Sequence, residues 1–161
     1  MREYTVIGSN ITVANQAVSL VAIMPPAGKA IEILRAWISQ HANATSAQQR
    51  VSLGVKATAF QTVTSVTPQK LKQGDPASGI AGATTIAAGK CGINASAEGA
   101  GTYTELIGDA FNVLNGYLWI PTPRETIILD SAAALAFVLQ FPAAPSTLTG
   151  WNFGVTFAEI S

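Results

Sequence analysis

Acid–base chemistry in this chain has a single candidate imidazole, because His41 is the only histidine among 161 residues. A hydrolytic triad needs a base that accepts a proton near neutral pH, and that base is usually histidine. His41 lies in the stretch His-Ala-Asn-Ala-Thr, and no Gly-x-Ser-x-Gly motif supplies a nucleophilic serine. We therefore expect no catalytic triad.

The chain also has few residues that could serve as a reactive thiol or as ligands of a metal ion. Cys91 is the only cysteine, so no intrachain disulfide is possible. The adjacent Lys90 would favour its thiolate, but a small residue in a glycine-rich loop is the interpretation we favour. One histidine and one cysteine do not make the three or four ligands of a transition-metal site. We expect neither a metal nor a cofactor.

Carboxylates offer the remaining route to catalysis, because glycoside hydrolysis requires only two of them at a fixed separation. The candidates are Asp75, Glu98, Glu105, Asp109, Glu125 and Asp130. The sequence shows no signature of a cleft around any pair. Our expectation is a protein that is not an enzyme, with a two-carboxylate enzyme as a rival hypothesis.

The scarcity of charge is the strongest compositional signal. Charged residues make up 11% of the chain, against roughly 25% in an ordinary soluble domain. Protein interfaces are depleted in Lys, Glu and Asp at their centres, because these groups lose hydration on burial. The composition therefore favours assembly with other protein copies.

The charge balance also argues against some partners. The formal net charge is zero and the pI is about 6.6, so the chain lacks the basic stripe that nucleic acid or a membrane surface requires. The charge-free runs contain Asn, Gln and Pro and do not predict a membrane span. The N-terminal stretch lacks the apolar region of a signal peptide, so we expect the product to stay in the cytoplasm where it is made, or to leave by cell lysis.

Alternation of apolar and polar residues dominates the chain and predicts strands. It marks a half-buried strand from Arg50 and two central core strands over residues 135–141 and 151–157. Helical periodicity is weak throughout. We predict one all-β domain over residues 1–161, a two-sheet sandwich of about eight strands with the topology of a jelly roll.

Three local signals refine this prediction. The apolar parity slips within residues 31–38, which predicts a β-bulge near Ile33 and Leu34 and leaves Arg35 and Trp37 on the outer side. Asn115-Gly116 predicts a hairpin or tight turn, and a short strand should follow within residues 125–130.

Residues 61–101 are rich in Gly, Thr, Ser and Ala and show no sustained alternation. A segment of this length without elements of its own is unusual in a compact domain unless it is a binding loop or an arm. We expect an extended arm that a neighbouring subunit orders, since the entropy of ordering a free coil is costly.

Several strings resemble one known group of proteins. They are Ile31-Glu32-Ile33-Leu34-Arg35-Ala36-Trp37, Ser46-Ala47-Gln48-Gln49-Arg50, Gly74-Asp75-Pro76-Ala77-Ser78, Phe111-Asn112-Val113-Leu114-Asn115-Gly116-Tyr117 and Phe141-Pro142-Ala143-Ala144-Pro145. Their order and spacing resemble capsid decoration, or cement, proteins of tailed bacteriophages. The resemblance implies a jelly-roll virion protein that forms trimers or other homo-oligomers, binds the major capsid protein and is located on the capsid surface.

On this hypothesis the contacts with protein partners lie in the arm and in the outward row of aromatic and basic residues. The expected contact residues are Arg35, Trp37, Lys70, Lys72, Asp75 and Trp119. A rival hypothesis is a carbohydrate- or receptor-binding module of a phage tail, because similar sandwiches present exposed aromatic side chains to sugars. Its platform would consist of Trp37, Tyr117 and Trp119.

Overall fold

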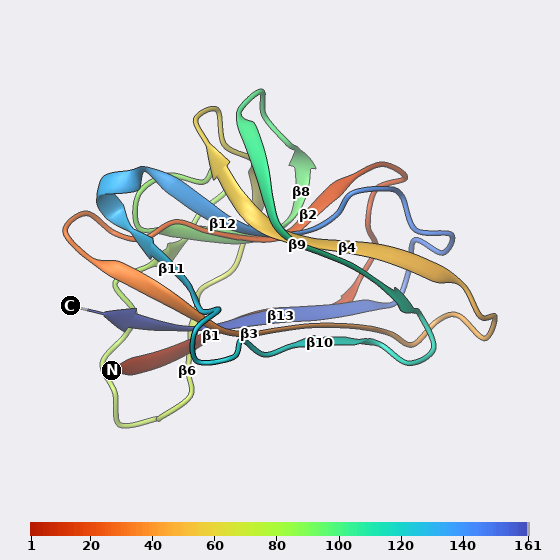
Figure 1. Cartoon of the computed structure of the whole chain (residues 1–161), viewed down its shortest axis with the longest axis horizontal. Coiled ribbons are helices and arrows are strands. Elements are labelled where there is room, and N and C mark those ends of the chain that lie inside the picture. Colours follow the sequence, from red (N-terminus) through yellow and green to blue (C-terminus); the bar gives the residue numbers. More distant parts are fainter. Residues whose placement is uncertain (161) are drawn as a thin grey trace.

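The computed structural model describes residues 1–160 and consists of two β-sheets packed face to face (Figure 1). The first sheet, sheet A, has the strand order β10 (Tyr117–Trp119), β3 (Ala30–Gln40), β13 (Trp151–Ile160), β1 (Arg2–Ile11) and β6 (Gln69–Lys70), and β11 (Ile127–Asp130) also pairs with β3. The second sheet, sheet B, has the order β5 (Thr62–Ser65), β8 (Lys90–Ala97), β2 (Val18–Ile23), β12 (Leu135–Phe141), β4 (Gln48–Ala57) and β9 (Thr102–Asn112), with β7 (Ala81–Gly82) beside β8. A 3-10 turn, η1 (Ser131–Ala133), leads into β12.

The order of the long strands is that of a jelly roll. We count β10 and β11 as one position and set aside β5 to β8. From β1 to β4 the chain then alternates between the two sheets. The strand order becomes β1-β13-β3-β10/β11 in sheet A and β2-β12-β4-β9 in sheet B. These are the two four-stranded sheets of a double Greek key. The predicted two-sheet, all-β architecture is confirmed.

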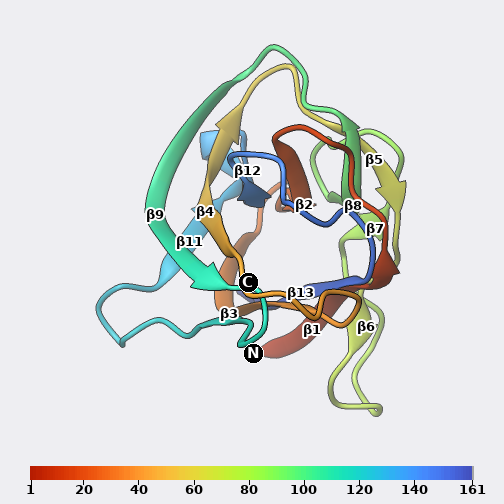
Figure 2. The same cartoon turned by 90° about the vertical axis from the view of Figure 1, so that its right-hand side faces the viewer.

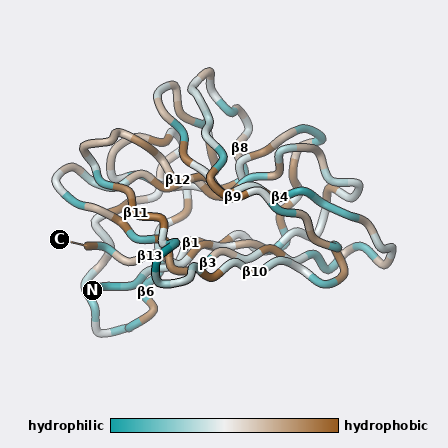
Figure 3. Tube along the Cα trace, viewed as in Figure 1, coloured by the Kyte–Doolittle hydropathy of each residue, from teal (hydrophilic) through white to brown (hydrophobic). Residues whose placement is uncertain are grey.

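The core forms where the inward residues of both sheets meet. β12 and β13 are central strands, as predicted, and their inward side chains include Phe137, Phe141, Phe153 and Phe157, all at most 1% exposed. Trp151 packs edge-on against Phe141, with ring centroids 4.8 Å apart. Hydrophobic residues follow the facing strands, whereas hydrophilic residues are concentrated in the loops (Figure 3).

The predicted bulge in β3 is confirmed. Ile33 pairs with Phe157 and Arg35 with Thr156, so Leu34 has no partner on β13. The extra residue lets Ile33 and Ala36 both face the core, because a one-residue insertion reverses the side-chain alternation.

The turn at Asn115-Gly116 is also confirmed, with Gly116 at φ +75° and its N–H donating to the Asn112 carbonyl. It does not close a hairpin, because β9 belongs to sheet B and β10 to sheet A. The short strand predicted within residues 125–130 is β11.

The prediction of an extended arm over residues 61–101 is wrong. The segment contains β5, β7 and β8, which widen sheet B, and β6, which widens sheet A. Its apolar residues Val63, Ile86 and Ala95 pack on Ala136 and Val138, on the face of sheet B that points away from the main core. The segment is therefore an insertion folded onto its own domain, and hereafter we call it the insertion.

The insertion makes the two sides of the sandwich unlike. On one side it adds strands to both sheets, whereas the opposite side ends in β9 of sheet B and in β10 and β11 of sheet A (Figure 2). These strands are not paired with one another, so this side of the sandwich is open between the sheet edges. Among residues 1–160, no segment covers the outer face of sheet A in the way that the insertion covers sheet B.

Candidate interaction surface

The outer face of sheet A presents an apolar row that crosses four neighbouring strands. Ile7 of β1 pairs with Gly154 of β13, Gly154 pairs with Trp37 of β3, and Trp37 pairs with Leu118 of β10. Directly paired residues share one face of a sheet. Ile7 is 42% exposed and Leu118 is 60% exposed, so the row is accessible at both ends.

Trp37 lies flat across the middle of this row because Gly154 has no side chain. A Cβ at Gly154 would approach the indole Cη2 atom to 2.6 Å and the Ile7 Cγ2 atom to 2.9 Å. The guanidinium carbon of Arg35 stands 4.7 Å from the centroid of the Trp37 ring, in cation–π geometry. The predicted outward pair of Arg35 and Trp37 is thus confirmed in position, and the two side chains contact each other.

Charge is almost absent around the row. The next cross-strand set on one side is Thr5, Thr156 and Arg35, and on the other side Ser39 pairs with Asn152. Arg35 is therefore the only charged residue in these three sets. We call this surface, defined by Thr5, Ile7, Arg35, Trp37, Ser39, Leu118, Asn152, Gly154 and Thr156, the sheet A face.

The three aromatic residues of the predicted sugar platform do not share one surface. Leu118 pairs with Trp37 on the outer side, so Tyr117 and Trp119 point to the opposite side of β10. The Tyr117 ring lies 5.8 Å from the ring of the core residue Phe111. A platform that joins these two residues to Trp37 is therefore excluded.

Trp119 instead lines a groove on the open side of the sandwich. The groove has a volume of about 440 Å³ and is lined by Leu106, Ile107, Trp119, Glu125 and Ile127. Its walls come from β9 on one sheet and from β10, β11 and the loop before β11 on the other. We call it the β9–β10 groove.

A second carboxylate lies beside this groove. Val51 faces the core and pairs with Asp109, so Asp109 is on the inner side of β9. Burial, and secondarily the negative charge of Asp109, raises the pKa of Tyr117 to about 12. Glu125 lines the groove itself, and the exposed Asp109 lies on the inner side of β9, two residues beyond the lining residue Ile107.

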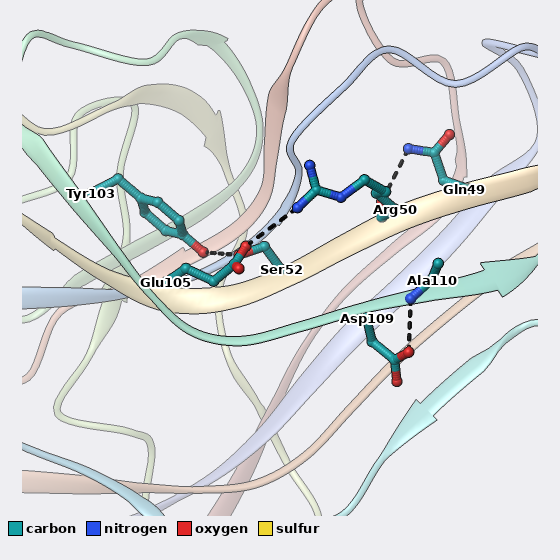
Figure 4. Close-up of polar contacts among 7 residues, drawn as sticks. All are labelled: Gln49, Arg50, Ser52, Tyr103, Glu105, Asp109 and Ala110. Carbon is teal, nitrogen blue, oxygen red and sulfur yellow. Dashed lines mark hydrogen bonds and ion pairs between the residues drawn. The ribbon is translucent and has the colours of Figure 1, made fainter.

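A polar cluster lies on the neighbouring strands β4 and β9 (Figure 4). Arg50 and Glu105 form an exposed ion pair at 3.9 Å, and the hydroxyls of Ser52 and Tyr103 are 2.5 Å apart. Burial raises the pKa of Tyr103 to about 12. The hydrogen bond between the neutral Tyr103 phenol and Ser52 joins β9 to β4, and a neutral phenol does not act as a base near neutral pH.

The candidate carboxylates are dispersed over the fold, and most accept hydrogen bonds from their own surroundings. Glu98 accepts from the Ser19 N–H and hydroxyl, Asp109 accepts from the Ala110 N–H, Glu125 accepts from the Thr122 hydroxyl and Asp130 caps η1 through the Ala132 N–H. Over residues 1–160, no three His, Cys, Asp or Glu side chains are grouped to hold a metal ion.

The single histidine and the single cysteine each contact residues of the fold, as the following distances show. His41 Nδ1 lies 3.0 Å from the Asn152 amide nitrogen. Cys91 is fully buried in β8, not in a loop as expected, and its Sγ donates to the Val66 carbonyl at 3.2 Å. Burial raises its pKa to about 12 despite the opposing effect of Lys90, so the thiol is not an activated nucleophile.

The remaining predicted contact residues lie at the end of β6 and in the loop that follows it, and β13 and β1 separate β6 from the strand of Trp37. Lys70 ends β6, and Lys72 and Asp75 follow it in the loop, where the Asp75 N–H donates to the Lys72 carbonyl. The six predicted contact residues are thus divided among the sheet A face, the β9–β10 groove and this loop.

Sequence reasoning missed the partners that complete each surface. Leu118 stands between Tyr117 and Trp119 in the sequence, and neighbouring side chains on a strand point to opposite sides. This alternation is the sequence signal that could have placed Leu118 on the outer side. Ile7 and Gly154 carry no such signal, because only the pairing of β1 with β13 places them beside Trp37.

No family model, curated protein or solved structure matches the chain. The helices described over residues 1–160 include none that is long and apolar enough to span a membrane.

Proposed function

We propose that the chain is a non-enzymatic virion structural protein that decorates a bacteriophage capsid, with the sheet A face as the surface that contacts the major capsid protein. One observation carries the proposal: the exposed side chains of Ile7 and Leu118 flank the half-buried Trp37 in one apolar row, and Arg35 is the only charged residue of the sheet A face. Tryptophan and arginine dominate binding hot spots, and charge-poor centres are typical of protein interfaces.

The contrast between the two sheets supports this assignment. The insertion covers the outer face of sheet B with its own apolar residues, including Val63 and Ile86. The corresponding face of sheet A keeps an apolar row without such a cover. Contiguous exposed apolar surface on a soluble domain marks a site for a partner.

The fold is compatible with the proposal without deciding it. Jelly rolls occur in viral capsid proteins and in lectins, and a fold does not fix a function. The resemblance of several sequence strings to decoration proteins favours the first class. On this proposal the chain is made in the host cytoplasm, associates with itself and ends on the capsid surface.

The test measures binding of the purified chain to capsids of its phage that were assembled without it. We expect saturable binding that Trp37→Ala weakens about 30-fold or more, since a central tryptophan contributes at least ~2 kcal/mol at a hot spot. Leu114→Ala is the matched control, because Leu114 is 50% exposed but lies outside the sheet A face. Absence of binding by the unmodified chain, or equal loss with both variants, would refute the proposal.

A second candidate function is carbohydrate binding in the β9–β10 groove, where Trp119 and Glu125 line the same cavity. An indole that stacks on a sugar ring beside a carboxylate that accepts from its hydroxyls is a common arrangement for sugar recognition. A glycan array decides it. Hits that disappear in Trp119→Ala but persist in Trp37→Ala would support this function, and an array without hits would remove it.

A further inference from the structure

We infer that the chain associates head to tail, with the loop after β6 of one copy seated in the β9–β10 groove of a second copy. The inference rests on the self-association that the proposed function includes, and it assigns the surfaces that carry it. Both surfaces lie outside the sheet A face, so contact with a capsid and contact between copies use different parts of the molecule.

The groove offers an apolar floor with an acidic rim. Leu106, Trp119 and Ile127 supply apolar walls around a cavity of about 440 Å³, and Leu106 is 49% exposed. Glu125 lines the cavity, and the exposed Asp109 lies on the inner side of β9, two residues beyond the lining residue Ile107. A fitting occupant therefore presents an apolar side chain flanked by cations.

The loop after β6 presents that combination. Leu71 is 45% exposed and stands between Lys70 and Lys72. Within residues 1–160 neither lysine forms an ion pair, and the one ion pair present joins Arg50 and Glu105. Long lysine side chains can direct their ammonium groups to carboxylates beside the site where the leucine is buried.

The loop is held in a defined shape before any partner arrives. The Leu71 N–H donates to the Glu3 carbonyl at 3.2 Å, and the Gln73 amide donates to the Lys70 carbonyl at 2.9 Å. The Tyr4 hydroxyl donates to the Pro76 carbonyl at 3.1 Å. A preorganised loop loses less entropy on docking than a free one.

The strand order decides between contact within one molecule and contact between two. The loop follows β6 at one edge of sheet A, and the groove adjoins β10 at the other edge, with β3, β13 and β1 between them. Figure 2 shows the loop and the β9–β10 side on opposite sides of the molecule. The loop therefore cannot reach its own groove.

The charges favour a head-to-tail contact over a two-fold one. A two-fold contact through the groove would bring Asp109 and Glu125 toward their own copies, and like charges at an interface are strongly unfavourable. A contact between groove and loop pairs these carboxylates with Lys70 and Lys72. Contacts of this heterologous kind close into rings when the rotation between copies permits.

Charge exchange tests the inference on the full chain by sedimentation velocity at low ionic strength. We expect the unmodified chain to form oligomers. Lys70→Glu with Lys72→Glu, and separately Asp109→Lys with Glu125→Lys, should each weaken association on the order of 100-fold. Lys29→Glu is the control, because Lys29 is also exposed but lies in neither surface.

Mixing the two double variants gives the decisive measurement. The acidic loop of one variant then meets the basic groove of the other, and the unmodified loop and groove also remain complementary, so mixed oligomers should form from two non-associating proteins. An unmodified chain that stays monomeric, oligomers that survive both exchanges, or a mixture that fails to assemble would overturn the inference. Capsid binding by chains that do not associate would overturn the inference and leave capsid decoration, the main part of the proposed function, standing. Charge-exchange rescue without capsid binding would support the inference and refute capsid decoration.

Discussion

The end of the insertion is anchored to sheet B by one carboxylate, and its removal should loosen the whole segment. Glu98 accepts hydrogen bonds from the Ser19 N–H at 2.6 Å and from the Ser19 hydroxyl at 2.5 Å. Ser19 is fully buried, and its hydroxyl also accepts from the Gln61 amide at the start of the insertion. Glu98→Ala removes the acceptor and leaves the Ser19 donors unsatisfied.

The cost follows from the chemistry of these bonds. A hydrogen bond to a charged group contributes about 1.5–3 kcal/mol, and a buried donor left without a partner carries its full desolvation cost. Because the two bonds share one carboxylate, we expect a loss of about 3 kcal/mol or more from the free energy of unfolding. In a domain of this size that loss lowers Tm by roughly 6–12 °C.

Thermal unfolding and limited proteolysis measure the effect together. Glu98→Ala should lower Tm and make residues 61–101 cleavable under native conditions. Glu105→Ala is the matched control, because its ion pair with Arg50 is exposed on both sides and such pairs contribute ~0–1 kcal/mol. A Glu98 variant as stable and as protease-resistant as the control would refute the view that this carboxylate holds the insertion in place.

Three further outcomes test other parts of the structure. The Cys91 thiol should stay unreactive toward a disulfide reagent at pH 8 and react only on unfolding, because burial raises its pKa to about 12; rapid reaction in the native state would contradict this. Tyr4, Tyr103 and Tyr117 all have raised pKa values, chiefly from burial, so absorbance at 295 nm should show no native ionisation near pH 10. The stabilisation from the neutral phenols of Tyr103 and Tyr117 is complete below pH 10 and is lost as the pH rises toward their pKa values of about 12, which denaturation at several alkaline pH values measures. Gly154→Val should lift the indole that covers it and alter tryptophan fluorescence, whereas an unchanged spectrum would show that the stacking is not as described.

The alternation of apolar and polar residues predicted much of the fold, because burial of one side of a strand requires an apolar residue at every second position. The slip in parity near Leu34 predicted the bulge, since Ile33 and Ala36 both have to face the core. The long alternation of Trp151, Phe153, Val155 and Phe157 predicted a central strand for the same reason. In these segments large side chains report the two-residue period without ambiguity.

The strands of the insertion were not predicted, because its small residues make the two-residue alternation of a strand hard to see. Cys91, Ile93 and Ala95 do alternate on β8 and are buried, so the signal exists but is weak. Gly92 stands between them on the other side of the strand, where a Cβ would approach the carbonyl oxygen of Thr64, on the paired strand β5, to 2.8 Å. The sequence alone does not distinguish a glycine required by this close approach from a glycine in a flexible loop.

The candidate surfaces lay beyond local pattern altogether. The β9–β10 groove joins residues 106 and 107 to residues 119–127 across two sheets, and this neighbourhood depends on the Asn115-Gly116 turn crossing between them. Trp37 was expected on the outer side from parity alone. Its companions on the sheet A face follow only from the strand order.

The strand order also controls when the sheet A face comes into existence. Its apolar row draws on β1, β3, β10 and β13, and β13 occupies the position between β1 and β3. A nascent polypeptide emerging from the ribosome has β1, β3 and β10 long before β13 is synthesised. Until that last strand inserts, Ile7 and Trp37 do not lie in one sheet, so the sheet A face is complete only after translation has passed residue 154.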